Sequence, residues 1–215
     1  MARSKFLTIA AAALVTFTFS AAPVLAQGDQ SSSTWSQNDT VRIIKDVQKQ
    51  IGSLTNYAVF DWITFGIHGK TLVLNGYASR PTLKEDAGRA VKGIPGITSV
   101  ENNIEVLPNS PNDDRVRAAV YNRIYTAPSL RRYNANAGRL GRGLSVARMA
   151  GGITVDPPIG YHAIHIIVKN GNVILYGVVA NASDSAIAGM QANSAPGAFS
   201  ITNDIVVEGA PAKSK

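Results

Sequence analysis

Hydrophobic positions between residues 39 and 107 predict two amphipathic helices. The first is expected over about 40–53, with Asp39 or Thr40 as its cap. Its apolar stripe follows helical spacing: Val41, Ile44, Val47 and Ile51. The second is expected over 81–92 and opens with proline, which lacks only an N–H that the first turn leaves unpaired. Each helix therefore has one face that must pack on an apolar layer.

Three strands are expected beside these helices, at 57–67, 71–77 and 97–107. Apolar residues alternate along them, as they do on a half-buried sheet. Phe60 and Trp62 fall on the face opposite the inward residues of the first strand. The order αββαβ predicts a two-layer α+β domain, with a three-stranded sheet and both helices on one face.

The same pattern occurs a second time. Residues 68–107 align without a gap to residues 169–208 after a shift of 101 positions. The matched pairs include Gly76 with Gly177, Gly96 with Gly197, and Asn102 with Asn203. Such a register predicts a tandem repeat. We expect a first domain over 39–107, a linker at 108–112, and a second domain over 113–208 that opens with Asp113 or Asp114 as a helix cap.

An insertion distinguishes the second copy. Its first helix is offset by 75 positions and its strands by 101, so 26 more residues lie between them, within about 127–160. The insertion contains five arginines against one acidic residue, Asp156: Arg131, Arg132, Arg139, Arg142 and Arg148. Arginine matches phosphate oxygens bidentately, so an anionic lipid surface is one expected partner. The alternative is a solvated loop, with a short helix near 143–149, that has no partner.

Composition places the chain outside the cytoplasm. Residues 1–26 have the basic start, apolar run and small-residue ending of a signal peptide cleaved near Ala26; an uncleaved membrane anchor is the alternative. A polar lead-in at 27–38 and a basic tail at 209–215 flank the two domains. The chain has no cysteine that could carry a lipid, so with the signal peptide we expect a soluble periplasmic protein that is not a lipoprotein. The net charge is +7. Export makes nucleic acid an unsuitable partner.

No arrangement of residues predicts catalysis, a cofactor or a metal site. His162 and His165 are close in sequence, but on a strand they face opposite sides. Without cysteine a zinc site is not expected. Gly76 and Gly177 fit a bulge or a packing position better than a ligand site. Asn102 and Asn203 fit structural amides that satisfy nearby backbone groups.

The aromatic face of the first strand has two interpretations. Phe60 and Trp62, with Tyr161 in the second copy, form either an exposed patch or the interface between the two domains. We favour the interface, because domains that follow one another in a chain usually pack together.

The repeated segment resembles the BON domain of bacterial osmotically inducible and nodulation proteins. A strand with glycine after an inward leucine, a helix, a Pro/Gly turn and a strand ending in Val-x-Asn-x-Ile-x-Val carry the resemblance. It covers 39–107 strongly and 113–208 through these matched positions: Gly177, Gly197, Ile201, Asn203, Ile205 and Val207. The resemblance implies a non-catalytic envelope protein that binds phospholipid surfaces or envelope partners and supports envelope integrity under osmotic stress.

Two functions therefore remain open from the sequence. The first is peripheral binding to anionic phospholipid through the arginine insertion. The second is a protein-interaction or chaperone-like stress module that uses Phe60 or Trp62. Recognition of peptidoglycan or another envelope polymer is a third, weaker idea.

Overall fold

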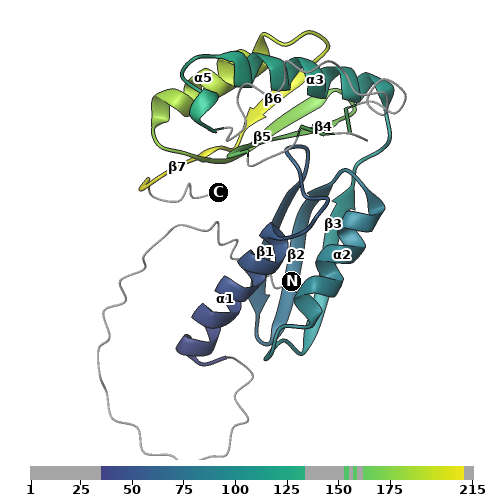
Figure 1. Cartoon of the computed structure of the whole chain (residues 1–215), viewed down its shortest axis with the longest axis vertical. Coiled ribbons are helices and arrows are strands. Elements are labelled where there is room, and N and C mark those ends of the chain that lie inside the picture. The colour runs from purple at the N-terminus through teal and green to yellow at the C-terminus, as the bar shows by residue number, and fades with distance from the viewer. Residues whose placement is uncertain (1–34, 134–152, 155–156, 159–161, 211–215) are drawn as a thin grey trace, which may run out of the picture.

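The computed structural model describes residues 35–133, 153–154, 157–158 and 162–210, which form two α+β domains (Figure 1). In each domain two helices cover one face of a sheet. The predicted fold class, two αββαβ units in tandem, is confirmed. Within these residues no helix is both long and apolar enough to cross a membrane.

The first domain pairs a hairpin with a parallel third strand. Its elements are α1 (Gln37–Gly52), β1 (Trp62–His68), β2 (Thr71–Ala78), α2 (Pro81–Lys92) and β3 (Ser99–Val106). β1 and β2 are antiparallel, with Phe65 opposite Leu74. β2 and β3 are parallel, and α2 provides the crossover that parallel neighbours need. The core lies between the helices and the sheet and includes Ile43, Val47, Leu72, Leu74, Leu83, Ala87 and Ile104.

The start and the buried stripe of α1 differ from the prediction. Ser36, not Asp39 or Thr40, caps the helix, and its side chain accepts from the Asp39 N–H at 3.2 Å. The buried stripe is Ile43, Val47 and Ile51, whereas Val41 is 53% exposed. Both stripes share two members, so spacing alone could not choose between them. Packing against the rest of the first domain's core selects Ile43.

Residues 57–61 are not part of β1, contrary to the prediction of a strand over 57–67. They form a turn in which the Asp61 N–H donates to the Ala58 carbonyl at 3.1 Å. The buried Asp61 carboxylate accepts from the Ala58 N–H at 2.9 Å and the Ser79 N–H at 2.6 Å. These bonds hold the turn against the end of β2, and Val59 and Phe60 within it point away from the first domain's core.

The second domain repeats the order of elements after its longer insertion. Its described elements are α3 (Pro111–Thr126), the short 3₁₀ helix η1 (Arg131–Tyr133), β4 (Ile164–Lys169), β5 (Asn172–Val179), α5 (Ala182–Asn193), β6 (Ser200–Asn203) and β7 (Val206–Val207). β6 and β7 pair in parallel with successive parts of β5, so the predicted last strand is interrupted. Ser110 caps α3 through the Asp113 N–H, so the prediction of Asp113 or Asp114 as the cap is wrong. The helix predicted near 143–149 lies outside the described residues.

The matched glycines and asparagines perform the same local tasks in both domains. A Cβ on Gly76 would lie 2.0 Å from the Trp62 carbonyl oxygen, and φ there is +115°. At Gly177 the corresponding oxygen, of Ala163, would lie 1.9 Å away. Asn102 donates to the Lys84 carbonyl at 2.7 Å, and Asn203 to the Ser185 carbonyl at 2.8 Å. Gly96 and Gly197 take positive φ in the turn after the second helix of each domain.

Candidate functional site

The turn at 57–61 carries the first domain into the core of the second. The Val59 carbonyl accepts from the Ile166 N–H on β4 at 2.8 Å. Val59 and Phe60 are 0% and 1% exposed and belong to the hydrophobic core formed by α3, β4, β5 and α5. The Phe60 ring meets the Tyr121 ring edge-on at 6.3 Å. Two residues of the first repeat are thus core residues of the second.

Aromatic rings continue this contact along the open faces of the two sheets. Trp62 stacks on Tyr176 with ring centroids 5.4 Å apart and planes 3° apart, and Tyr77 lies 6.4 Å from the same ring. His165 lies 5.4 Å from Tyr57 and 5.1 Å from Trp62. We call this contact between the domains the seam; its members are Tyr57, Val59, Phe60, Trp62, Tyr77, His165, Ile166 and Tyr176. Tyr161, the third aromatic predicted with Phe60 and Trp62, lies outside the described residues.

The two histidines near the seam have separate environments. The buried His162 ring contacts the Tyr121 hydroxyl at 3.0 Å on the core side. His165 is 9% exposed, and its buried Nδ1 has no hydrogen-bond partner. Burial lowers the pKa of His165 to about 4, with His162 as a smaller cause in the same direction. Among the described residues no cluster of metal-ligating side chains occurs.

Acidification is expected to weaken the folded protein through His165. Its pKa is about 4 when folded and about 6.5 when unfolded, so the unfolded chain binds the proton first. The free energy of unfolding should fall as the pH drops from about 6.5 to about 4, by up to about 3 kcal/mol. Urea unfolding across this range should show the loss, and the His165→Phe variant should lack it.

Asp61 acts in the opposite direction on acidification. Burial raises the pKa of Asp61, so protonation near that pKa favours the folded state. The difference in unfolding free energy between the wild type and His165→Phe does not contain the Asp61 contribution, because both chains retain Asp61. Parallel pH profiles for the two chains would show that His165 is not the responsible group.

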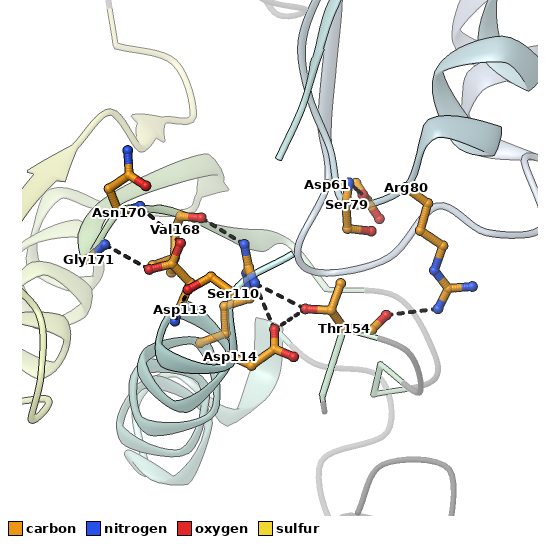
Figure 2. Close-up of polar contacts among 11 residues, drawn as sticks. Asp61, Ser79, Arg80, Ser110, Asp113, Asp114, Thr154, Val168, Asn170 and Gly171 are labelled. Atoms are coloured by element: carbon orange, nitrogen blue, oxygen red, sulfur yellow. Dashed lines mark hydrogen bonds and ion pairs between the residues drawn. The ribbon is translucent and has the colours of Figure 1, made fainter. Parts of the chain in front are cut away.

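The acidic residues at the start of α3 are turned inward (Figure 2). Asp113 accepts from the backbone N–H groups of Asn170 at 2.9 Å and Gly171 at 2.8 Å, and so holds the turn between β4 and β5. Asp114 accepts from Arg117 Nη1 at 2.7 Å and from the Thr154 hydroxyl. Both carboxylates are buried, so neither is available to pair with a charged group at the surface.

Arg117 organises this buried cluster although it is a charged side chain in the core. It is 1% exposed, and its Nη2 donates to the Val168 carbonyl at 2.8 Å. Its Nε has no hydrogen-bond partner. Arg80 of the first domain donates to the Thr154 carbonyl at 2.8 Å, as Figure 2 shows. Thr154, at the end of the insertion, therefore connects α3 with the first domain.

Asp184, in the first turn of α5, is also buried and bonded. Its Oδ2 accepts from the Tyr133 hydroxyl at 2.5 Å and from Arg132 Nη2. The Tyr133 hydrogen bond is the main cause that lowers the pKa of Asp184. Arg132, one of the five arginines predicted to contact lipid, therefore lies in an ion pair, with 54% of its side chain exposed.

Apart from the buried Arg117 and the paired Arg132, the arginines of α3 and η1 are exposed. Arg115 and Arg123 on α3 and Arg131 on η1 are exposed, and within the described part of the chain none of them forms an ion pair. Every acidic residue of α3, η1 and α5 is buried. We call Arg115, Arg123 and Arg131 the basic face. In the first domain Arg42 pairs with Asp39 and Asp46, and Arg89 with Asp86, although exposed lysines such as Lys45 and Lys49 are present there.

The structure divides the five predicted lipid-binding arginines. Arg131 joins the basic face and Arg132 is paired, while Arg139, Arg142 and Arg148 lie outside the described residues. Sequence reasoning missed Arg115 and Arg123. They are eight positions apart on one helix, about 80° apart around its axis, and both belong to its exposed stripe. The spacing of the two arginines could have been noticed in the sequence. The sequence does not show that the neighbouring acidic residues are buried.

Comparison with known proteins finds one matching family. The model of the BON domain matches residues 66–108 and 151–209. A structural protein of the type III secretion system of Chlamydia trachomatis, CdsD, is similar at 13% identity and a TM-score of 0.24, over 80% of this chain and 94% of that one. A structure of the CdsD C-terminal domain is similar at 14% identity and a TM-score of 0.25, over 80% of this chain and 98% of that one. TM-scores this low support no conclusion about this chain. No curated protein matches it.

Proposed function

Because this chain is a tandem BON-domain protein, we propose that it is an exported, non-catalytic protein that binds anionic phospholipid at the surface of a membrane. At the level of the family, the BON domain indicates an envelope-associated protein with a phospholipid-binding role. Support for envelope integrity under osmotic stress is the physiological role that we attach to this binding.

The basic face is the observation that carries the proposal. Its three arginines are exposed, while the acids of the same helices are buried in bonds to backbone, Arg117, Arg132 and Tyr133. A basic residue near an anionic membrane contributes about 1 kcal/mol, so three contribute about 3 kcal/mol. Binding of that strength is reversible and falls as salt screens the charges.

Neutralising the basic face should reduce binding to anionic vesicles. The triple variant Arg115→Gln, Arg123→Gln and Arg131→Gln should lose most of the binding that the chain from Gln27 onward shows to vesicles of phosphatidylglycerol and phosphatidylcholine. The cause is the loss of about 3 kcal/mol of attraction to lipid phosphates. Co-sedimentation at low and at physiological salt measures the effect.

A matched triple variant in the first domain controls for net charge. Lys45→Gln, Lys49→Gln and Lys92→Gln remove the same charge from exposed positions and should leave most of the binding intact. Equal losses in the two triple variants would contradict a specific basic face. A third variant, with Arg139, Arg142 and Arg148 replaced by Gln, measures what the rest of the insertion adds.

The protein-interaction alternative loses part of its basis. It relied on Phe60 and Trp62 as an accessible aromatic surface. Phe60 is 1% exposed, and Trp62 is half-buried and stacked on Tyr176, so the two do not form a freely accessible aromatic surface. The basic face is exposed, which is why we place lipid binding first.

A further inference from the structure

Phe199 is the most exposed large hydrophobic side chain of the described residues. It lies in the turn between α5 and β6 and is 78% exposed. Its N–H donates to the Gly171 carbonyl at 2.8 Å. Its ring lies over the Gly171 backbone so closely that a Cβ on Gly171 would come within 2.5 Å of the ring. The backbone is thus fixed and one side of the ring is supported, while the rest of the ring faces outward.

Contacts of this turn place Phe199 beside the start of α3. Gly171 donates to the Asp113 carboxylate at 2.8 Å, and Asp113 belongs to the first turn of α3. A Cβ added at Gly197, two residues before Phe199, would lie 3.3 Å from the side chain of Val116 on the same helix. Arg115, the first arginine of the basic face, lies between these two contact residues in sequence. An exposed aromatic ring and an exposed arginine therefore share one end of the second domain.

The repeat shows that the fold does not require an aromatic residue at this position. Thr98 occupies the equivalent position in the first domain. Its N–H makes the same backbone bond, to the Lys70 carbonyl at 3.3 Å, and its hydroxyl donates to that carbonyl at 3.0 Å. A small polar residue thus completes the turn. Phe199 adds apolar surface that nothing in the described part of its own domain buries.

We propose that Phe199 is a shallow membrane anchor that enters the boundary between headgroups and acyl chains while Arg115 contacts lipid phosphates. The inference rests on the proposed function, because it requires an anionic bilayer as the partner. A bilayer suits this end because interfacial binding combines basic residues with a few apolar side chains buried to a shallow depth. An exposed aromatic ring near the exposed Arg115 has that combination.

Replacing Phe199 by the residue of the other repeat tests the anchor. Phe199→Thr should weaken binding to anionic vesicles about tenfold, the effect of returning one aromatic side chain to water. Its thermal unfolding should match that of the wild type. The remaining binding should still fall with salt, because the basic face is unchanged. Val41→Thr, at a residue that is 53% exposed on α1, is the matched control and should bind like the wild type.

A second variant reports the depth of the ring directly. Phe199→Trp should keep the vesicle affinity, and lipids brominated near the headgroup should quench its fluorescence more than that of the wild type. Wild-type affinity in Phe199→Thr, together with no added quenching in Phe199→Trp, would overturn the anchor while the arginine dependence still supported lipid binding. Failure of the wild type to bind any anionic vesicle would overturn both proposals. A dimer in solution that Phe199→Thr abolishes without loss of vesicle binding would assign the ring to a second copy instead.

Discussion

Replacing Phe60 by alanine is expected to destabilise the second domain, although Phe60 precedes the first strand of the first. The side chain is 1% exposed and packs in the core formed by α3, β4, β5 and α5. Removing a buried phenylalanine leaves a cavity and costs about 3–5 kcal/mol. Hydrogen exchange should therefore speed up in α3 and β4 more than in β2 and β3. Urea unfolding should give the size of the loss.

Phe65→Ala is the control for this prediction. Phe65 lies on β1 and packs against the core of the first domain. Its replacement should raise exchange first in β1, β2 and β3. If Phe60→Ala gave the same pattern as Phe65→Ala, the turn at 57–61 would be a part of the first domain only, and the seam would contribute little to the second.

Replacing Arg117 by methionine is the other change with a large expected effect. Methionine fills much of the same space but leaves Asp114 buried without its cationic partner. Breaking a buried ion pair in this way costs about 3–5 kcal/mol. Arg115→Met, two residues earlier on the exposed side of α3, should change the free energy of unfolding by less than about 0.5 kcal/mol. Urea unfolding of the two variants gives the comparison.

The reason for the loss can be separated from packing by a second replacement. Asp114→Asn in the Arg117→Met background removes the unpaired charge and keeps an acceptor for the Thr154 hydroxyl. The double variant should regain about 1–3 kcal/mol relative to Arg117→Met. If Asp114→Asn made the protein less stable still, the cost of losing Arg117 would come from its bonds to Val168 and from packing, not from the charge of Asp114.

Local signals were sufficient for most of the fold. α2 begins and ends where the proline and the helical spacing placed it, at Pro81 and Lys92. The turn glycines and the alternation of strand residues were repeated in the second copy, so each copy supported the other. These features depend on neighbours within a few residues or on one adjacent strand, which is why periodicity and repetition revealed them.

The seam could not be predicted in the same way. Alternation along 57–67 fits a strand, but it does not say whether Val59 and Phe60 face their own sheet or another domain. The turn at 57–61 depends on the bond between Asp61 and Ser79, which are 18 positions apart. The sequence favours an interface between domains at Phe60 and Trp62. It does not predict that Phe60 enters the core of the other domain, because the spacing of nearby residues is the same in either case.

The candidate site depended even more on long-range contacts. The sequence contains Asp113, Asp114 and Asp184 near the arginines, so it predicts that both acidic and basic side chains are exposed on α3 and α5. Only the fold shows that their partners are the turn at 170–171, Arg117 with Thr154, and Tyr133 with Arg132. Arg117 itself is followed by apolar Ala118 and Ala119, and its burial could not be told from the exposure of Arg115.

The entry of Val59 and Phe60 into the second core makes the stability of the second domain depend on the first. A second repeat synthesised alone, from Ser110 onward, would lack two of its own core residues and would leave the Ile166 N–H on β4 without its acceptor. Folding of the second domain therefore requires the segment around Val59 and Phe60, which is synthesised before it. A protease that cuts the linker at 108–109 should not release a stable second domain, because the two halves remain joined through a shared interior.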